Sequence, residues 1–327
     1  MTTFFRLLLV SVLAASHAPA QSPFDYDARL PLDLRDSLWQ TQEGIEIRAI
    51  SFASPKGGRV TGLLYLPTTP APHPGVVLGH GAPGNSRGFR TVELGLALAK
   101  SGAMVLAIDA PFARRNAPPL SFTPSDSADQ VQLIVDFRRG VDLLSSRPDV
   151  DRSRLGYLGN SYGGAQGALL VGVEPRITAA VLRVADGGFL AHFSDPCDEG
   201  ARGPETIAGC LRWSIAEEDL PAAQRERWVA SLRPIEPIQF VGNTRARLLL
   251  QSGRQDDAVT PARARRLHAT VPPGATVEWY DSGHRLPPGA TLSAVAFLAR
   301  HLGLSAPSEA LADWLEARAA VPASPLR

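Results

Sequence analysis

The hydrophobic positions of this chain fall into short apolar runs separated by longer stretches of helical spacing. The apolar runs predict buried strands at residues 75–78, 104–108, 155–158, 178–184, 246–251 and 275–280. The stretches between them predict helices at 91–100, 127–145, 162–171, 261–270 and 289–302. Strands that alternate with helices form a mostly parallel sheet covered on both faces. The pattern therefore predicts an α/β protein.

Two more strands are predicted ahead of this alternation. Residues 45–53 and 59–66 have strand character and are separated by Ser-Pro-Lys-Gly-Gly, a turn signal that suits a hairpin. Before them, residues 21–44 are polar and contain proline, which predicts an N-terminal strap over the domain. A proline-rich link at 67–74 leads into the alternating region.

Regularity stops between residues 187 and 242, inside the predicted sheet. An irregular or helical insertion between two sheet strands is typical of a cap over an active site. The alternative is a second packing layer that touches no substrate. The predicted core is then 45–186 together with 243–305, and residues 306–327 are predicted to form a C-terminal helix and tail.

The composition is that of an ordinary globular protein and gives no sign of an electrostatic partner. The 327 residues are 44% hydrophobic, and 33 Lys and Arg balance 32 Asp and Glu. The basic residues form no dense tract, so no nucleic-acid partner is expected.

The first twenty residues have the layout of a secretory signal. Arg6 precedes a short apolar run at 7–15, and Ala18-Pro19-Ala20 supplies the small residues that a signal peptidase reads. The run is too short to span a bilayer, although a non-cleaved anchor is the alternative. We expect an exported protein that begins near Gln21 and has no stable membrane span after processing.

Export changes the interpretation of the two cysteines. Cys197 and Cys210 lie in one polar segment, and an oxidising compartment permits a disulfide between them. A disulfide is therefore expected rather than two free thiols. With two cysteines and no neighbouring histidine pattern, no metal site is expected.

A Gly-x-Ser-x-Gly sequence at 159–163 directly follows the predicted strand 155–158. A sharp strand-to-helix turn at this point strains the serine and exposes its hydroxyl above the sheet, which marks Ser161 as a candidate nucleophile. The pattern is short, and a second copy occurs at 84–88. Its Ser86 stands several loop residues beyond strand 75–78, just before a helix, where serine is common as a turn or capping residue. Ser161 is therefore favoured over Ser86.

His284 is the best candidate for a base. It follows strand 275–280 in a glycine-containing loop, so its ring can reach over the strand ends toward Ser161. An imidazole titrates near pH ~6.5 and can take up and return a proton at neutral pH. The other histidines lie in less suitable places, namely His17, His73, His80, His192, His268 and His301.

Four blocks in a fixed order carry a resemblance to a known family. They are Leu78-Gly79-His80-Gly81, the 159–163 motif, Gly253-Arg254-Gln255-Asp256 with Val259-Thr260-Pro261 behind it, and Ser282-Gly283-His284. From about residue 45 to 303, except for 187–242, the chain resembles the α/β-hydrolases, especially dienelactone-hydrolase-like and prolyl-oligopeptidase-like esterases. The resemblance implies the α/β-hydrolase fold and calls for no metal or organic cofactor. The irregular segment 187–242 is then the inserted cap.

The resemblance also implies the role of each site residue. Ser161 is the nucleophile, His284 the base, and Asp256 the acid that orients the histidine. Asp257 next door is an alternative acid, and so is Asp186, because some members carry the acid after that earlier strand. The backbone N–H groups of Ala82 and Tyr162 are the expected oxyanion donors.

These residues predict an exported serine hydrolase that cleaves small carboxylic esters through an acyl-enzyme. A serine peptidase or amidase with the same triad is the first alternative. An acyltransferase and a non-catalytic binding protein on the same scaffold are less favoured. Arg114 or Arg115, after strand 104–108, could hold a substrate carboxylate, but loop-anchoring or solvent-facing roles are favoured for both.

Overall fold

The computed structural model describes residues 22–193 and 221–319. The expected signal segment, 1–20, and both cysteines, Cys197 and Cys210, lie outside the described residues, so their roles remain predictions. Within the described residues, every helix is too short or too polar to cross a bilayer.

One sheet of nine strands forms the centre of the described part of the chain, in the order β1-β2-β3-β5-β4-β6-β7-β8-β9. Three strand pairs, β1–β2, β2–β3 and β3–β5, are antiparallel. The remaining pairs, from β5 to β9, are parallel. This confirms the predicted hairpin and the mostly parallel sheet. The strands are β1 (Arg35–Gln42), β2 (Ile45–Ala53), β3 (Arg59–Leu66), β4 (His73–Gly79), β5 (Met104–Ile108), β6 (Val150–Asn160), β7 (Ile177–Arg183), β8 (Arg247–Gly253) and β9 (Thr276–Tyr280).

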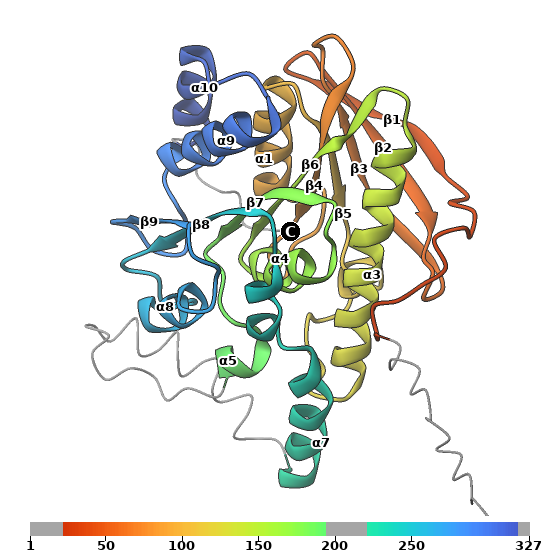
Figure 1. Cartoon of the computed structure of the whole chain (residues 1–327), viewed down its shortest axis with the longest axis vertical. Coiled ribbons are helices and arrows are strands. Elements are labelled where there is room, and N and C mark those ends of the chain that lie inside the picture. Colours follow the sequence, from red (N-terminus) through yellow and green to blue (C-terminus); the bar gives the residue numbers. More distant parts are fainter. Residues whose placement is uncertain (1–21, 194–220, 320–327) are drawn as a thin grey trace, which may run out of the picture.

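Helices cover both faces of the sheet, as Figure 1 shows. Helices α3 and α4 pack on one face and α1, α9 and α10 on the other, each over its own apolar cluster. The strands supply both clusters because successive side chains point to opposite faces: Leu182 joins the first and Val181 the second. The helices are α1 (Phe89–Lys100), α2 (Pro111–Arg114), α3 (Ser125–Ser146), α4 (Tyr162–Val173), α5 (Phe189–Phe193), α7 (Ala222–Leu232), α8 (Pro261–His268), α9 (Pro288–Leu302) and α10 (Glu309–Ala319), with short 3₁₀ turns η1 (Arg233–Ile235), η2 (Pro237–Gln239) and η3 (Val241–Asn243).

One strand falls inside the segment expected to be a strap. β1 pairs with β2 at the edge of the sheet, and most of its side chains are exposed. An edge strand with little buried surface has no need of alternating apolar residues, so the hydrophobic pattern gave no strand signal there. Residues before β1 are anchored on α3, where Arg138 donates a hydrogen bond of 2.6 Å to the carbonyl of Phe24.

The described parts of the 187–242 insertion are helical. Trp228 of α7 is fully buried and donates a hydrogen bond of 2.8 Å to Asp126 of α3. Helix α7 therefore serves as a packing layer against α3. Helix α5, by contrast, lies near the carboxyl ends of β6 and β7, where the candidate site is found (Figure 1).

Candidate active site

Ser161 occupies the tight turn between β6 and α4. Its φ is 55° and its ψ is −119°, a backbone conformation that non-glycine residues rarely adopt. The turn is held from both sides, because the Ser161 N–H donates to the carbonyl of Arg183 at 2.8 Å and the Ser161 carbonyl accepts from Ala165 at 2.9 Å. Strain of this kind persists only where the surroundings enforce it, and here it presents the hydroxyl to the pocket.

The motif needs glycine at both ends because neighbouring backbone oxygens lie too close to leave room for a Cβ atom. A Cβ on Gly159 would lie 2.2 Å from the carbonyl oxygen of Gly163. A Cβ on Gly163 would lie 2.3 Å from the carbonyl oxygen of Gly79, at the end of β4. The turn at Ser161 is thus packed against the neighbouring strand β4 as well as against itself.

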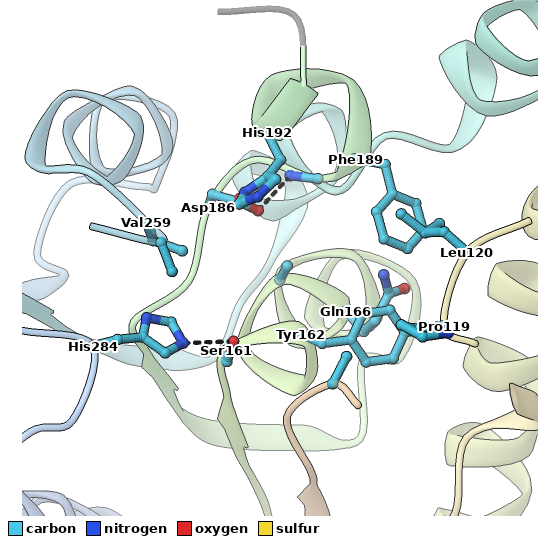
Figure 2. A pocket seen from close by; sticks show the side chains of 14 residues that line it. Pro119, Leu120, Ser161, Tyr162, Gln166, Asp186, Phe189, His192, Val259 and His284 are labelled. Atoms are coloured by element: carbon cyan, nitrogen blue, oxygen red, sulfur yellow. Dashed lines mark hydrogen bonds and ion pairs between the residues drawn. The ribbon is translucent and has the colours of Figure 1, made fainter. Parts of the chain in front are cut away.

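The three residues predicted to work together do lie together. The Ser161 Oγ is 2.8 Å from His284 Nε2 (Figure 2). On the other side of the ring, His284 Nδ1 is 2.8 Å and 3.0 Å from the two carboxylate oxygens of Asp256. Asp256 is 2% exposed, and its Oδ1 also accepts the N–H groups of Ala258 and Val259 at 2.9 and 2.8 Å. The carboxylate is therefore fixed before any substrate arrives.

The alternative acids lie elsewhere. Asp257 is exposed beside Asp256. Asp186, just past β7, is buried and 2.6 Å from Nδ1 of His192 on α5. Burial raises the pKa of Asp186, but the charge and hydrogen bond of His192, the Gly188 N–H and the charge of Arg263 together outweigh it, and the net shift is downward.

The environment of His284 favours its protonated form. Burial lowers the pKa of the imidazole, which is the largest single effect. The hydrogen bond to Asp256 and the negative charges of Asp256, Asp257 and Asp186 together outweigh burial, so the pKa is raised above its ordinary value. An imidazolium that forms during a reaction is stabilised in the same way.

Two backbone N–H groups beside this site, those of Ala82 and Tyr162, have no hydrogen-bond partner among the described residues. Both residues line the pocket with Ser161. His80 holds the Ala82 loop in place: its Nδ1 is 2.8 Å from the Gly81 carbonyl, and its Nε2 accepts the Ala110 N–H at 2.9 Å. Sequence reasoning placed His80 in this loop but did not find its clamping role.

A model of the alpha/beta hydrolase family matches residues 76–314, which is well over half of the chain. The protein belongs to the α/β-hydrolase family. This confirms the predicted fold class, and the order Ser161, Asp256, His284 along the chain is the order found in these enzymes.

One curated relative of this α/β-hydrolase is similar over part of its length. The alpha/beta hydrolase domain-containing protein WAV2 of Arabidopsis thaliana is 28% identical over 141 residues, which are 43% of this chain and 42% of that protein. The chain thus matches well under half of the length of this curated relative.

Solved structures share the fold over most of the chain. An acetyl xylan esterase from Paenibacillus sp. R4 is similar with a TM-score of 0.65 and 24% identity, over 83% of this chain and 90% of that one. Acetyl xylan esterase 1 from Thermoanaerobacterium sp. JW/SL YS485 gives 0.66 and 18%, over 85% and 90%. A cold-adapted esterase from an Arctic intertidal metagenomic library gives 0.57 and 17%, over 82% and 97%. At these identities the likeness establishes the fold.

The pocket of this α/β-hydrolase is small and mainly apolar. It encloses about 200 Å³ and opens onto Ser161. Figure 2 shows Ser161 and His284 on one side and Phe189, Leu120 and Pro119 on the other. The Tyr162 ring stacks on Phe189 of α5 with centroids 5.9 Å apart, so the insertion supplies part of the wall.

The second Gly-x-Ser-x-Gly copy of the α/β-hydrolase lies outside this pocket. Ser86 is fully buried, and its N–H donates to Asp109 at 2.7 Å. Its hydroxyl has no hydrogen-bond partner in the described part of the chain. Ser86 is thus a turn residue tied to the end of β5, as its position in the sequence suggested.

The arginines after β5 already have partners. Arg114 bonds to the buried Asp136 at 2.7 Å, and Arg115 bonds to Asp129 at 3.0 Å. Both therefore anchor their loop. Across residues 22–193 and 221–319, no group of three or more His, Cys, Asp or Glu side chains is arranged to hold a metal ion.

Proposed function

We propose that this α/β-hydrolase cleaves carboxylic esters, with Ser161 as nucleophile, His284 as base and Asp256 as the acid that orients it. The observation that carries the proposal is the continuous hydrogen-bonded chain from Ser161 Oγ through His284 to the buried Asp256 carboxylate. The three solved structures reported above are all named esterases, which favours an ester over an amide.

In the proposed reaction, Ser161 Oγ attacks the carbonyl carbon while His284 Nε2 accepts the hydroxyl proton. The carbonyl oxygen becomes an oxyanion and accepts hydrogen bonds from the N–H groups of Ala82 and Tyr162. Fixed donors of this kind lower the barrier by about 3–4 kcal/mol each. The intermediate then collapses, the alcohol leaves with the proton from His284, and the acyl group stays on Ser161. Water that loses its proton to His284 then attacks the acyl carbon, the bond to Ser161 Oγ breaks, Oγ takes back the proton from His284, and the carboxylic acid leaves.

The test is hydrolysis of p-nitrophenyl acetate, butyrate and octanoate by the wild-type protein, Ser161→Ala and Ser86→Ala. We expect Ser161→Ala to lower kcat/KM by on the order of 10⁴-fold or more, because the nucleophile is lost. Ser86→Ala should keep most of the activity. Activity that survives Ser161→Ala would contradict the proposal, and faster cleavage of butyryl p-nitroanilide than of p-nitrophenyl butyrate would favour the amidase alternative.

A further inference from the structure

A second cavity reaches His284 from the other face of the sheet. It encloses about 330 Å³ and is lined mainly by Arg90, Glu93, Asn160, Arg183, His284 and Arg285. His284 is the one residue of the described chain that lines both this cavity and the apolar pocket. Asn160, the residue before Ser161, forms part of its wall. The cavity therefore adjoins the reaction centre without sharing the apolar walls of the first pocket.

Arg183 is the most unusual residue in this cavity. It ends β7, and strand alternation places its side chain on the same face as Val181, above α1 and α9. The residue is 4% exposed, yet its guanidinium makes no hydrogen bond or ion pair with any described residue. Burial lowers the pKa of Arg183 to about 10, with Glu93 opposing and Arg90 adding to the effect. A buried cation without a carboxylate partner is costly and rarely retained without a use.

The other charges around the cavity leave a positive excess. Arg90 is half-buried and Arg285 exposed, and neither has a hydrogen-bonded carboxylate among the described residues. Burial, and then the like charge of Arg285, lower the pKa of Arg90. Glu93 is the acid that lines the cavity, and its Oε2 also lies 3.9 Å from Nε of Arg318. Three guanidinium groups therefore line the cavity with one carboxylate, that of Glu93. Arg318 also lies near this carboxylate.

We propose that this cavity is an anion-binding subsite that takes a carboxylate group beside the reaction centre, borne by the ester substrate or by a free carboxylic acid. Guanidinium groups bind carboxylates through paired, charge-assisted hydrogen bonds. No described residue accepts a hydrogen bond from Arg183, so its donors are available for this purpose. Arg114 and Arg115 show the contrast, because protein carboxylates already occupy them. The substrate form of this proposal rests on the proposed esterase function.

Two measurements test the subsite. The first is calorimetric titration of Ser161→Ala with benzoate, with benzamide as the neutral probe, in a buffer without phosphate or sulfate. The second compares kcat/KM for acetyl release from 4-acetoxybenzoate with that from its methyl ester, in which the carboxylate is masked as a neutral ester. Both are repeated with Arg183→Gln and with Arg285→Gln, an exposed position where folding is not at risk. Arg300→Gln, an exposed arginine on α9, is the charge-matched control.

We expect benzoate and not benzamide to bind, and Arg183→Gln to lower benzoate affinity or the ratio of the two kcat/KM values by about tenfold to a hundredfold. A change in the ratio identifies a carboxylate on the substrate. A change in benzoate binding alone identifies a free acid. The proposal is overturned if Arg183→Gln and Arg285→Gln change neither benzoate affinity nor the kcat/KM ratio. It is also overturned if the control Arg300→Gln lowers either quantity by the same factor. If neither ester is hydrolysed, the esterase function fails, and the titration still decides the subsite.

Discussion

Ser161 and Ser86 both stand in the middle of a Gly-x-Ser-x-Gly sequence, yet their surroundings share almost nothing. Ser161 follows a strand directly, has a φ of 55°, and meets His284 at 2.8 Å. Ser86 lies in a loop, fully buried, with its N–H bonded to Asp109 and its hydroxyl facing no partner among the described residues. The two motifs differ only at their fourth residue, Arg87 against Tyr162, whereas their positions relative to the sheet are quite different.

The comparison teaches that a Gly-x-Ser-x-Gly sequence becomes a candidate catalytic site only where the edge of the sheet places an acid and a base beside its serine. Parallel register places Gly159 beside Gly79 and Asn160 beside Arg183, so the loops after β4, β6 and β7 meet at one edge. The loops after β8 and β9 add Asp256 and His284 at the same edge. Ser86 lies seven residues beyond the end of β4 and is turned away into the protein.

After the loss of the Ser161 nucleophile itself, the largest effect should come from removing the acid that distinguishes the Ser161 site. In Asp256→Asn, the amide cannot stabilise the imidazolium, and its N–H₂ group favours the wrong histidine tautomer. We expect kcat on p-nitrophenyl butyrate to fall by about 10³- to 10⁴-fold. Asp257→Asn is the matched control, since it removes an equal charge one residue away on an exposed side chain. A large loss of activity in Asp257→Asn with little loss in Asp256→Asn would mean that Asp257, and not Asp256, is the acid.

The residual activity of Asp256→Asn should also show a changed pH profile. Only neutral His284 can accept the serine proton, so kcat/KM rises as pH increases through the histidine pKa. In the wild type, burial lowers that pKa, but Asp256 and the other nearby carboxylates raise it above the ordinary value. Without the Asp256 charge, burial dominates and the acid limb should move to lower pH. A limb that stays in place would mean that another group controls it.

The next largest difference is expected between alanine substitutions of the last glycine in each motif, Gly163 and Gly88. A Cβ on Gly163 would lie 2.3 Å from the backbone oxygen of Gly79, and neither backbone can move freely. A Cβ on Gly88 would meet its nearest atom at 3.2 Å, and Gly88 has a φ of −59° that alanine adopts easily. We expect Gly163→Ala to lower the free energy of unfolding by about 1–3 kcal/mol and to reduce activity, measured by urea denaturation and ester hydrolysis. Gly88→Ala should cost less than about 1 kcal/mol. Equal effects would remove the steric distinction between the two copies.

Most of the scaffold could be predicted from the sequence, because buried strands and amphipathic helices carry strong periodic signals. The edge strand β1 could not, since its side chains are mainly exposed and follow no apolar pattern. Ser161, Asp256 and His284 could be brought together because each follows a strand of one parallel sheet. Two features could not be predicted: the hydrogen bonds by which His80 holds the Ala82 loop, and the lack of a partner for the Arg183 guanidinium among the described residues. Each depends on which groups lie within reach in the folded protein. Spacing along the chain does not contain that information.

The smallest effect is expected for Ser86→Ala, which removes only the Ser86 hydroxyl. Because this buried oxygen has no hydrogen-bond partner within the described residues, its removal should leave the free energy of unfolding unchanged or raise it by up to about 1 kcal/mol. Ser101→Ala is the matched control, since Ser101 is also buried and its hydroxyl donates to the Ala97 carbonyl at 3.1 Å. That substitution should cost about 1 kcal/mol in urea denaturation. A loss at Ser86 as large as at Ser101 would mean that the Ser86 hydroxyl is bonded in solution, and the second motif would then have a structural role of its own.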